Sequence, residues 1–214
     1  MITFIISAFV TFLTIIDPVG LAPVVIALTA NLNEAQRNKI ITRAIVISAV
    51  IIAFFALVGR FLLDRLGIGL YAFNIAGGIL LFLVAVDMLF GRSSGARETA
   101  AEQEEALTRE DISVFPLAIP MIAGPGTIAT TILYVSLASG TGNLLSFVAV
   151  GGAIIVTLAV AWVVMRSSLW IIKHMGRTGI LVLSRILGIL LAALAAQFVL
   201  NGVVAFAHAN GMLK

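Results

Sequence analysis

The stretch Thr3–Thr29, TFIISAFVTFLTIIDPVGLAPVVIALT, is apolar enough to cross a membrane, yet it carries Asp17-Pro18-Val19-Gly20 near its middle. A crossing helix needs about 20 apolar residues, and this stretch has 27. Pro18 removes a backbone N–H group and disfavours helical geometry at the residue before it. We therefore predict a membrane helix that is interrupted at Asp17.

A second stretch of this kind, Ile112–Ala138, contains Gly124-Pro125-Gly126-Thr127 and two further prolines upstream. All five prolines of the chain lie in these two stretches. Backbone that leaves the helix at membrane depth is tolerated only where it is buried in protein or lines a wet cavity. The first and fourth helices are therefore both predicted to be discontinuous, with their breaks facing the protein interior.

The composition of the whole chain is that of a membrane protein. Of the 214 residues, 61% are apolar and only 11% are charged, and the mean hydropathy is +1.18. So few charges cannot cover a water-facing surface. Four more stretches are long enough to span a bilayer, which predicts an all-α polytopic membrane protein with six transmembrane helices; these stretches are Ala44–Leu63, Leu66–Phe90, Leu144–Met165 and Gly179–Ala207.

Lys and Arg predict the orientation, because they concentrate in cytoplasmic loops. Ten of the 13 lie in the first, third and fifth connections, namely Arg37, Lys39, Arg43, Arg92, Arg97, Arg109, Arg166, Lys173, Arg177 and Arg185. Both termini are then expected in the periplasm. The polar stretch Gly91–Asp111 is expected to be a cytoplasmic linker, with a short surface helix over Glu98–Leu107.

The two halves of the chain resemble each other. Asp17-Pro18-Val19-Gly20 aligns with Gly124-Pro125-Gly126-Thr127 at an offset of 107, and Gly78–Met88 aligns with Gly188–Phe198 at an offset of 110. We predict a first three-helix repeat over 1–90, the linker over 91–111 and a second repeat over 112–214. Three crossings per repeat place the second copy upside down. Such inverted repeats are typical of secondary transporters.

Each break would expose the N-terminus of a second half-helix, whose free N–H groups and dipole attract a carboxylate. Carbonyls freed on the other side of a break can accept from an ammonium group, so two facing breaks suit an amino acid. Thr127, Thr130 and Thr131 follow the second break and offer hydroxyl groups. Asp17 has two compatible interpretations, a helix cap and a site for proton or Na⁺ coupling.

Other polar or small residues in the spans favour helix packing. Asn74 aligns with Ser184, and Gln197 lies one turn from Asn201. We expect interhelical hydrogen bonds from these side chains, and keep Asn74, Thr130 and Gln197 as secondary site candidates. Close-packing faces are expected at Gly77-Gly78, at Gly151-Gly152 and along Ala192–Ala196.

Other classes of function find little support in the sequence. The chain has no cysteine, its two histidines, His174 and His208, are isolated, and no phosphate loop or nucleophile motif occurs. We expect no enzyme, no metal site and no bound cofactor. The net charge of +3 comes without the clustered basic face that nucleic-acid binding requires.

The break motifs, together with the run Arg185–Ala192, resemble the MarC family of bacterial inner-membrane proteins over the whole chain. Members of the SnatA group in that family are described as transporters of small neutral amino acids, and the wider grouping resembles an amino-acid exporter superfamily with three-plus-three inverted spans. The resemblance implies that one set of residues frames the substrate site: Asp17, Pro18, Gly20, Gly124, Pro125, Gly126 and Thr127.

We therefore expect a secondary transporter that exports small neutral amino acids by alternating access around a midplane site. The first alternative is a transporter of another small solute or of drugs. A drug site would be expected to be rich in aromatic residues, whereas only 8% of this chain is aromatic. The second alternative is a membrane scaffold or sensor that transports nothing.

Overall fold

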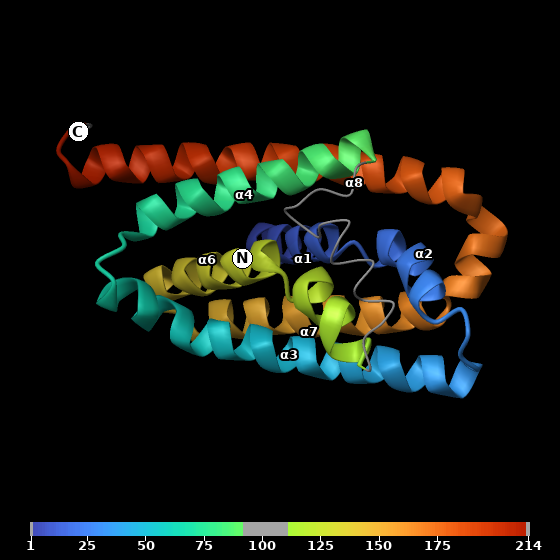
Figure 1. Cartoon of the computed structure of the whole chain (residues 1–214). Helices are drawn as coiled ribbons and strands as arrows, with labels where there is room; N and C mark the ends of the chain where they lie inside the picture. Colours follow the sequence, from blue (N-terminus) through green and yellow to red (C-terminus); the bar gives the residue numbers. More distant parts are fainter. Residues whose placement is uncertain (1, 92–110, 213–214) are drawn as a thin grey trace.

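The computed structural model describes residues 2–91 and 111–212, and every regular element in these ranges is helical (Figure 1). The elements in chain order are α1 (Ile2–Ile16), α2 (Pro18–Leu28), α3 (Glu34–Arg65), α4 (Leu70–Phe90), η1 (Ser113–Ile122), α6 (Pro125–Thr141), α7 (Leu144–Arg166) and α8 (Ser168–Ala209). The short helix expected over Glu98–Leu107 lies outside the described residues.

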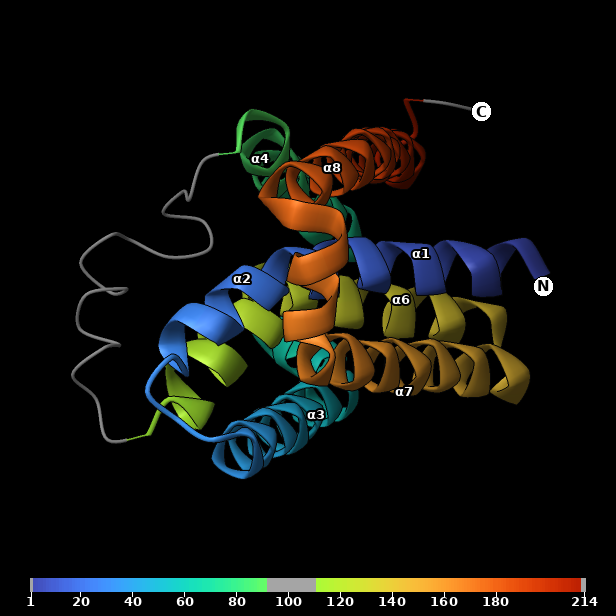
Figure 2. The same cartoon turned by 90° about the vertical axis from the view of Figure 1, so that its right-hand side faces the viewer.

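Among the described residues, five segments are long and apolar enough to cross a membrane, and a bent pair makes a sixth. Four of the five are α3, α4, α7 and the Thr178–Ala209 part of α8, and the fifth is α1 together with α2. The bent pair is η1 with α6. Figure 2 shows the outer ends of α1 and α8 on one side of the molecule, and the ends of α4 and η1 that border the linker on the other. The chain is thus an all-α polytopic membrane protein.

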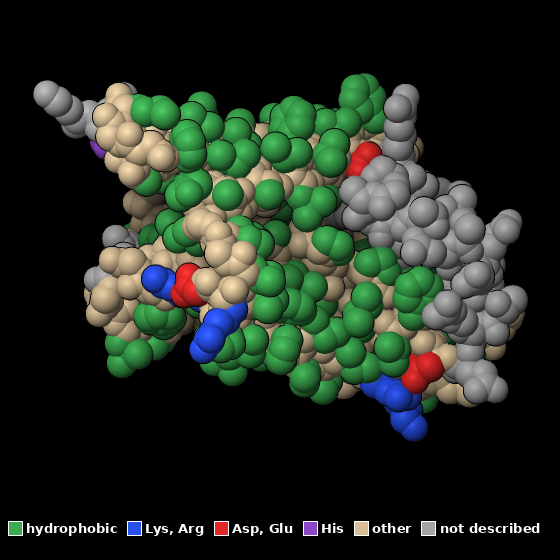
Figure 3. Space-filling view, turned by 60° about the vertical axis from the view of Figure 1, so that its left-hand side comes forward, with side chains coloured by type: hydrophobic (Ala, Val, Ile, Leu, Met, Phe, Trp, Pro, Cys, Tyr) green, Lys and Arg blue, Asp and Glu red, His purple; other side chains and the backbone are tan. Residues whose placement is uncertain are grey.

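The outer surface is the kind that faces lipid. Figure 3 shows a face that is mostly hydrophobic across its width, with charged side chains toward the ends. Leu57 on α3 is 84% exposed and Ile155 on α7 is 68% exposed. A soluble monomer rarely exposes apolar patches of this extent. The hydrocarbon core of a bilayer would cover them.

The two predicted breaks differ in severity. At the first, only Asp17 leaves helical geometry, with φ 45° and ψ 63°. Hydrogen bonds from Asp17 N to the Leu13 carbonyl and from Leu21 N to the Asp17 carbonyl, both 3.0 Å, continue across it. The segment Ile2–Leu28 therefore remains a single span. The interruption is real but smaller than we predicted.

The second break bends the chain by 53° between η1 and α6. Before this break η1 has wide π-type turns, and Phe115 and Ile119 have extended backbone geometry. Each of these residues precedes a proline, Pro116 or Pro120. A residue before proline is driven toward extended geometry and the proline itself lacks a donor. Prolines four residues apart therefore disturb the whole first half of this span.

Two helices extend beyond the spans predicted for them. Asn33 and Gln36 form a capping box at the start of α3. Gln36 N donates to Asn33 Oδ1 at 2.9 Å, and Asn33 N donates to Gln36 Oε1 at 3.1 Å. Helix α3 therefore begins well before Ala44. The long α8 changes direction at Gly176, whose φ is 63°. Figure 2 shows the part before Gly176 running across the ends of its neighbours, from α7 to the long part of α8.

Helices α4 and α8 lie side by side along most of their length (Figures 1 and 2). A Cβ atom at Gly78 would lie 2.8 Å from the Ala195 carbonyl oxygen, and one at Gly188 would lie 2.9 Å from Met88 Cβ. Glycine is required at both positions for this close approach. The expectation for Gly151-Gly152 was wrong, because nothing lies within 4 Å of a Cβ at either residue. These two glycines face open space on α7 rather than another helix.

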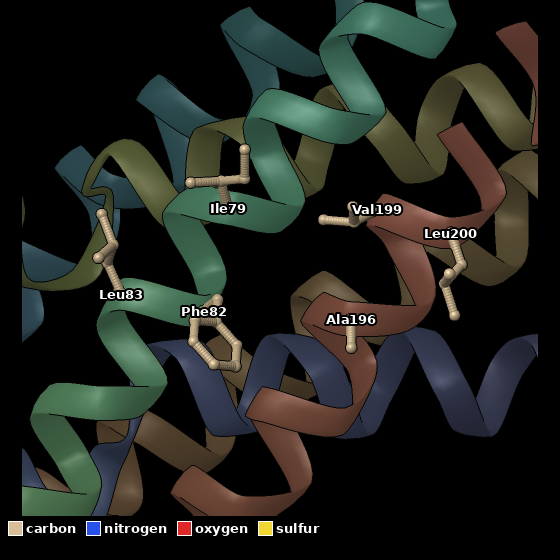
Figure 4. A pocket seen from close by; sticks show the side chains of 6 residues that line it. All are labelled: Ile79, Phe82, Leu83, Ala196, Val199 and Leu200. Atoms are coloured by element: carbon tan, nitrogen blue, oxygen red, sulfur yellow. The ribbon is translucent and has the colours of Figure 1, made fainter. Parts of the chain in front are cut away.

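The same helix pair forms an apolar groove of about 380 Å³ on its outer side (Figure 4). Its lining comes only from α4 and α8: Ile79, Phe82, Leu83, Ala196, Val199 and Leu200. Several of these side chains are about half exposed, and none belongs to the breaks. The groove is part of the lipid-facing surface and not the candidate site.

Candidate substrate site at two helix breaks

The first break is built around the Asp17 carboxylate. This side chain is 2% exposed, and its Oδ1 accepts a hydrogen bond from Gly20 N at 3.0 Å. It therefore caps the N-terminus of α2, as the structural interpretation of the sequence predicted. Aspartate is one of the few side chains that tolerates the left-handed geometry seen at this residue.

Two further residues hold this carboxylate in place. Ser184 Oγ, on α8, donates to Asp17 Oδ2 at 3.3 Å. Gly20 leaves room for it, because a Cβ atom there would overlap the Asp17 carboxylate and displace it. The sequence did not reveal either contact. The only signal for Ser184 was its alignment with Asn74 in the internal repeat.

The second break has no carboxylate. Gly124 is the N-cap of α6 and offers no side chain to the helix, and Pro125 occupies the first helical position. Thr127 Oγ1 donates to the Ile122 carbonyl at 2.8 Å, which ties the start of α6 back to the end of η1. A Cβ atom at Gly124 would overlap the Pro120 carbonyl oxygen. The motif Gly124-Pro125-Gly126-Thr127 therefore makes the turn itself.

The two breaks meet in the interior of the protein. A Cβ atom built on Gly126 would lie 3.6 Å from Ile15 on α1, 3.6 Å from Leu81 on α4 and 4.0 Å from Val84. Ile15 precedes Asp17 by two residues and Gly126 follows Gly124 by two. The buried side chains around Ile15 and those around Ile16 belong to two separate apolar clusters. The breaks thus lie where the two halves of the core join.

The structure buries most of the residues that the sequence singled out. Asp17 and Pro18 are buried at the first break with Gly20 beside them, and Gly124, Gly126 and Thr127 are buried at the second. Pro125, between the last two glycines, is exposed. No observation tests whether these residues bind a substrate, so their assignment to a substrate site stays a prediction.

The secondary candidates separate into two groups. Thr130 is fully buried on α6 and Asn74 is 7% exposed on α4, and neither Thr130 Oγ1 nor Asn74 Oδ1 has a hydrogen-bond partner among the described residues. Gln197 instead lies on an exposed face of α8, where its Nε2 donates to Asn201 Oδ1 at 2.8 Å within the same helix. Gln197 is not brought to the breaks.

A separate polar contact fixes the end of η1 that borders the linker. Arg43 Nη1 on α3 lies 2.9 Å from Asp111 Oδ2. The Ser113 hydroxyl donates to this carboxylate, and together with the Arg43 charge it holds the pKa of Asp111 below its ordinary value. Both ion-pair side chains are partly exposed, so this contact contributes little to stability. It marks where η1 meets α3.

In 2–91 and 111–212, no three His, Cys, Asp or Glu side chains gather as a metal site would require.

Comparison with known proteins identifies the family of this membrane fold. The model of the MarC family, described as an integral membrane protein family, matches residues 2–207. The chain belongs to the MarC family. No solved structure matches it.

MarC relatives occur in both bacteria and archaea. The chain is 34% identical to the UPF0056 membrane protein MJ1677 of Methanocaldococcus jannaschii, over 92% of this chain and 95% of that protein. It is 34% identical to the membrane protein YhcE of Escherichia coli, over 91% and 89%, and 32% identical to YvbG of Bacillus subtilis, over 93% of each. These names describe membrane proteins and give no substrate. The protein is a multi-pass integral membrane protein of this family.

Proposed function

We propose that this MarC-family protein is a secondary transporter that exports small neutral amino acids across the inner membrane, with its substrate site between the two helix breaks. The observation that carries the proposal is the closeness of Gly126 to Ile15 and to the middle of α4, within van der Waals range of a Cβ atom built on the glycine. It brings two interrupted helices together in a buried position. Interrupted helices that face each other near the membrane centre are the usual substrate site of secondary transporters.

An inverted repeat would supply the two equivalent ways of opening that alternating access needs. The packing of α4 on α8 supports it. Gly78 approaches Ala195 and Val199, while Gly188 approaches Ala85 and Leu89. With the offset of 110 between the halves, Gly78 corresponds to Gly188. Its partners Ala195 and Val199 correspond to Ala85 and Leu89, so the two contacts are equivalent. A two-fold axis in the membrane plane would produce this reciprocity.

The pairing of the other helices supports the same symmetry. Under it, α1 with α2 corresponds to η1 with α6, and α3 corresponds to α7. The contact of α1 with α7 corresponds to that of η1 with α3. The contact of α2 with α7 corresponds to that of α6 with α3, and the contact of α2 with α8 corresponds to that of α6 with α4. Each of these three contacts has its counterpart in the other half, whereas among the described residues the contacts of α1 with α6 and with α8 have none of comparable extent. We therefore propose repeats over 1–90 and 112–214.

Asp17 is the proposed coupling residue. It is buried at the break, and a carboxylate at membrane depth is expensive unless it is paired or functional. Its capping bond to Gly20 N is compatible with a second role in binding a proton or Na⁺. Coupling would make export depend on the gradient of that cation.

The charge bias of the connections favours an orientation with both termini in the periplasm and the linker in the cytoplasm. Single cysteines test this cleanly because the chain has none. Gly140→Cys, with nothing within 4 Å of its Cβ, should react with a membrane-impermeant maleimide in intact spheroplasts. Ala35→Cys, exposed at the start of α3, should react only after the membrane is opened. The reverse pattern would show that the orientation is inverted.

Transport itself is tested in liposomes that contain the purified protein. Vesicles loaded with unlabelled L-alanine or glycine should take up the labelled amino acid by counterflow, and protein-free vesicles should not. Activity only with another class of solute would favour the first alternative. Absence of flux for every solute tested, with folded protein in the membrane, would favour a scaffold or sensor.

A further inference from the structure

The interrupted helices are packed differently on the two sides of the breaks. Figure 2 shows α1 and α6 running toward the end of the molecule that carries the termini, called here the terminus side, and α2 and η1 running toward the opposite end, the linker side. On the terminus side α1 packs on α6 and on α8. The equivalent pairs on the linker side are η1 with α2 and η1 with α4, and among the described residues neither makes a contact of comparable extent.

Tyr134 on α6 lies at the centre of the packing on the terminus side. Its side chain is 2% exposed, and its hydroxyl forms hydrogen bonds with Ser7 Oγ at 2.9 Å and with Thr11 Oγ1 at 3.0 Å, both on α1. Three other rings contact the Tyr134 ring at centroid distances of 5.7, 5.9 and 5.8 Å. We call the whole cluster the tyrosine latch; its members are Tyr134, Ser7, Thr11, Phe4 and Phe12 on α1, and Phe198 on α8.

The equivalent positions on the linker side cannot form such a cluster. With the offset of 107, Tyr134 corresponds to Ala27 on α2, and Phe12 corresponds to Ile119 on η1. Ala27 is exposed and Ile119 is 42% exposed, whereas Phe12 is fully buried. The remaining members of the latch also correspond to residues without a ring or a hydroxyl group, namely Asp111, Val114, Ala118 and Met88.

Unequal packing of two equivalent halves has a direct meaning in an inverted repeat. A protein that obeyed the two-fold axis fully would make both sets of contacts or neither. A protein that opens to one side at a time makes one set and leaves the other, and exchanging the two sets gives its opposite state. In that opposite state α2 would pack on η1, and α1 would separate from α6.

We propose that the tyrosine latch is the gate of the substrate site on the terminus side, and that the structure is the state in which this gate is closed. Closure on the linker side lacks the rings and hydroxyl groups of the latch, so it is the less stable of the two, and the protein rests with its terminus side closed. This inference rests on the proposed function, because it assigns a gate to the proposed site. With the linker in the cytoplasm, the resting protein would take its substrate from the cytoplasm, as an exporter must.

The test detects the approach of α2 to η1 in the opposite state. The double variant Ala27→Cys/Ile119→Cys places the two cysteines of an otherwise cysteine-free chain at exposed positions, so it should fold. These positions correspond to two rings of the latch that contact each other. In liposomes a short bismaleimide should join the two cysteines only when α2 packs on η1. The initial rate of joining, measured by mass spectrometry, therefore follows the population of the opposite state.

Tyr134→Phe in this background keeps the ring contacts and removes both hydrogen bonds to α1. Two lost hydrogen bonds should raise the population of the opposite state, and with it the initial rate of joining, by roughly tenfold. Ser7→Ala removes one of the two bonds, so the rate should rise by a smaller factor. It also keeps the test decisive if Tyr134→Phe does not fold.

Tyr71→Phe is the matched control, because Tyr71 is the only other tyrosine of the chain. It lies outside the latch, on α4, where its ring contacts Phe206. The rate of joining should stay at the level of the parent double variant.

The outcomes separate the gate from the function on which it rests. Faster joining in Tyr134→Phe and in Ser7→Ala, with no change in Tyr71→Phe, supports the gate. Equal rates in all variants, a rise in Tyr71→Phe as large as that in Tyr134→Phe, or no joining at all would overturn it, and counterflow of L-alanine by the wild type would then still support transport. Faster joining in Tyr134→Phe without flux of any amino acid would leave the conformational change and remove the proposed function.

Discussion

Liposomes containing Asp17→Asn are expected to exchange labelled amino acid by counterflow but to lose accumulation driven by a pH or Na⁺ gradient. Asparagine keeps a side-chain oxygen for Gly20 N, tolerates left-handed geometry and caps a helix about as well as aspartate. Its amide can also donate to Ser184 Oγ, which lies 3.3 Å from Asp17 Oδ2 in the native protein. The fold is therefore retained, and only the charge and its titration are lost.

The comparison with Asp17→Ala separates coupling from capping. Alanine removes the acceptor for Gly20 N, and the lost cap should lower the free energy of unfolding by roughly 0.5–2 kcal/mol. Both variants should lack gradient-driven flux, but only Asp17→Ala should show a lower melting temperature. Full gradient-driven flux in Asp17→Asn would contradict a coupling role and leave Asp17 as a cap.

Gly124→Ala is expected to prevent the protein from folding stably. The new Cβ atom would overlap the Pro120 carbonyl oxygen, which belongs to the backbone and cannot rotate away as a side chain would. Relief requires the turn between η1 and α6 to open. A clash of this kind should cost about 3 kcal/mol or more. The measurements are the yield of protein extracted from membranes and the melting temperature in detergent.

Gly140→Ala is the matched control on the same helix. Nothing lies within 4 Å of a Cβ atom at Gly140, and alanine is favoured over glycine inside a helix. Its yield and melting temperature should equal or exceed those of the wild type. A Gly124→Ala protein as stable as this control would mean that the turn at the second break is not packed as described.

The positions of the breaks could be predicted because their causes are local. Proline lacks an N–H group and restricts the residue before it, so Asp17-Pro18 and Gly124-Pro125 indicated interruptions, although Pro23 lies inside α2 without breaking it. The internal alignment also found Gly78 and Gly188, which the structure places at close helix contacts.

Contacts between helices could not be predicted in the same way. The faces of a span that meet lipid and those that meet the core are both apolar, so the sequence does not indicate how each helix is rotated. Gly151 and Gly78 therefore looked alike, but only Gly78 lies against a neighbour. The bond from Ser184 to Asp17 and the unpartnered hydroxyl of Thr130 depend on the same rotations.

The helical segment Ser168–Met175 makes the two halves of the protein mechanically unlike. In the first half, α3 and α4 are joined by the four residues from Leu66 to Gly69, with no helical segment between them. In the second, eight helical residues, about 12 Å long at 1.5 Å per residue, separate α7 from the turn at Gly176 (Figure 2). This helical segment sets the distance between the end of α7 and the start of the long part of α8. Any swing of the long part of α8 relative to α7 must then pivot at an end of this segment, at Ser167 or at Gly176.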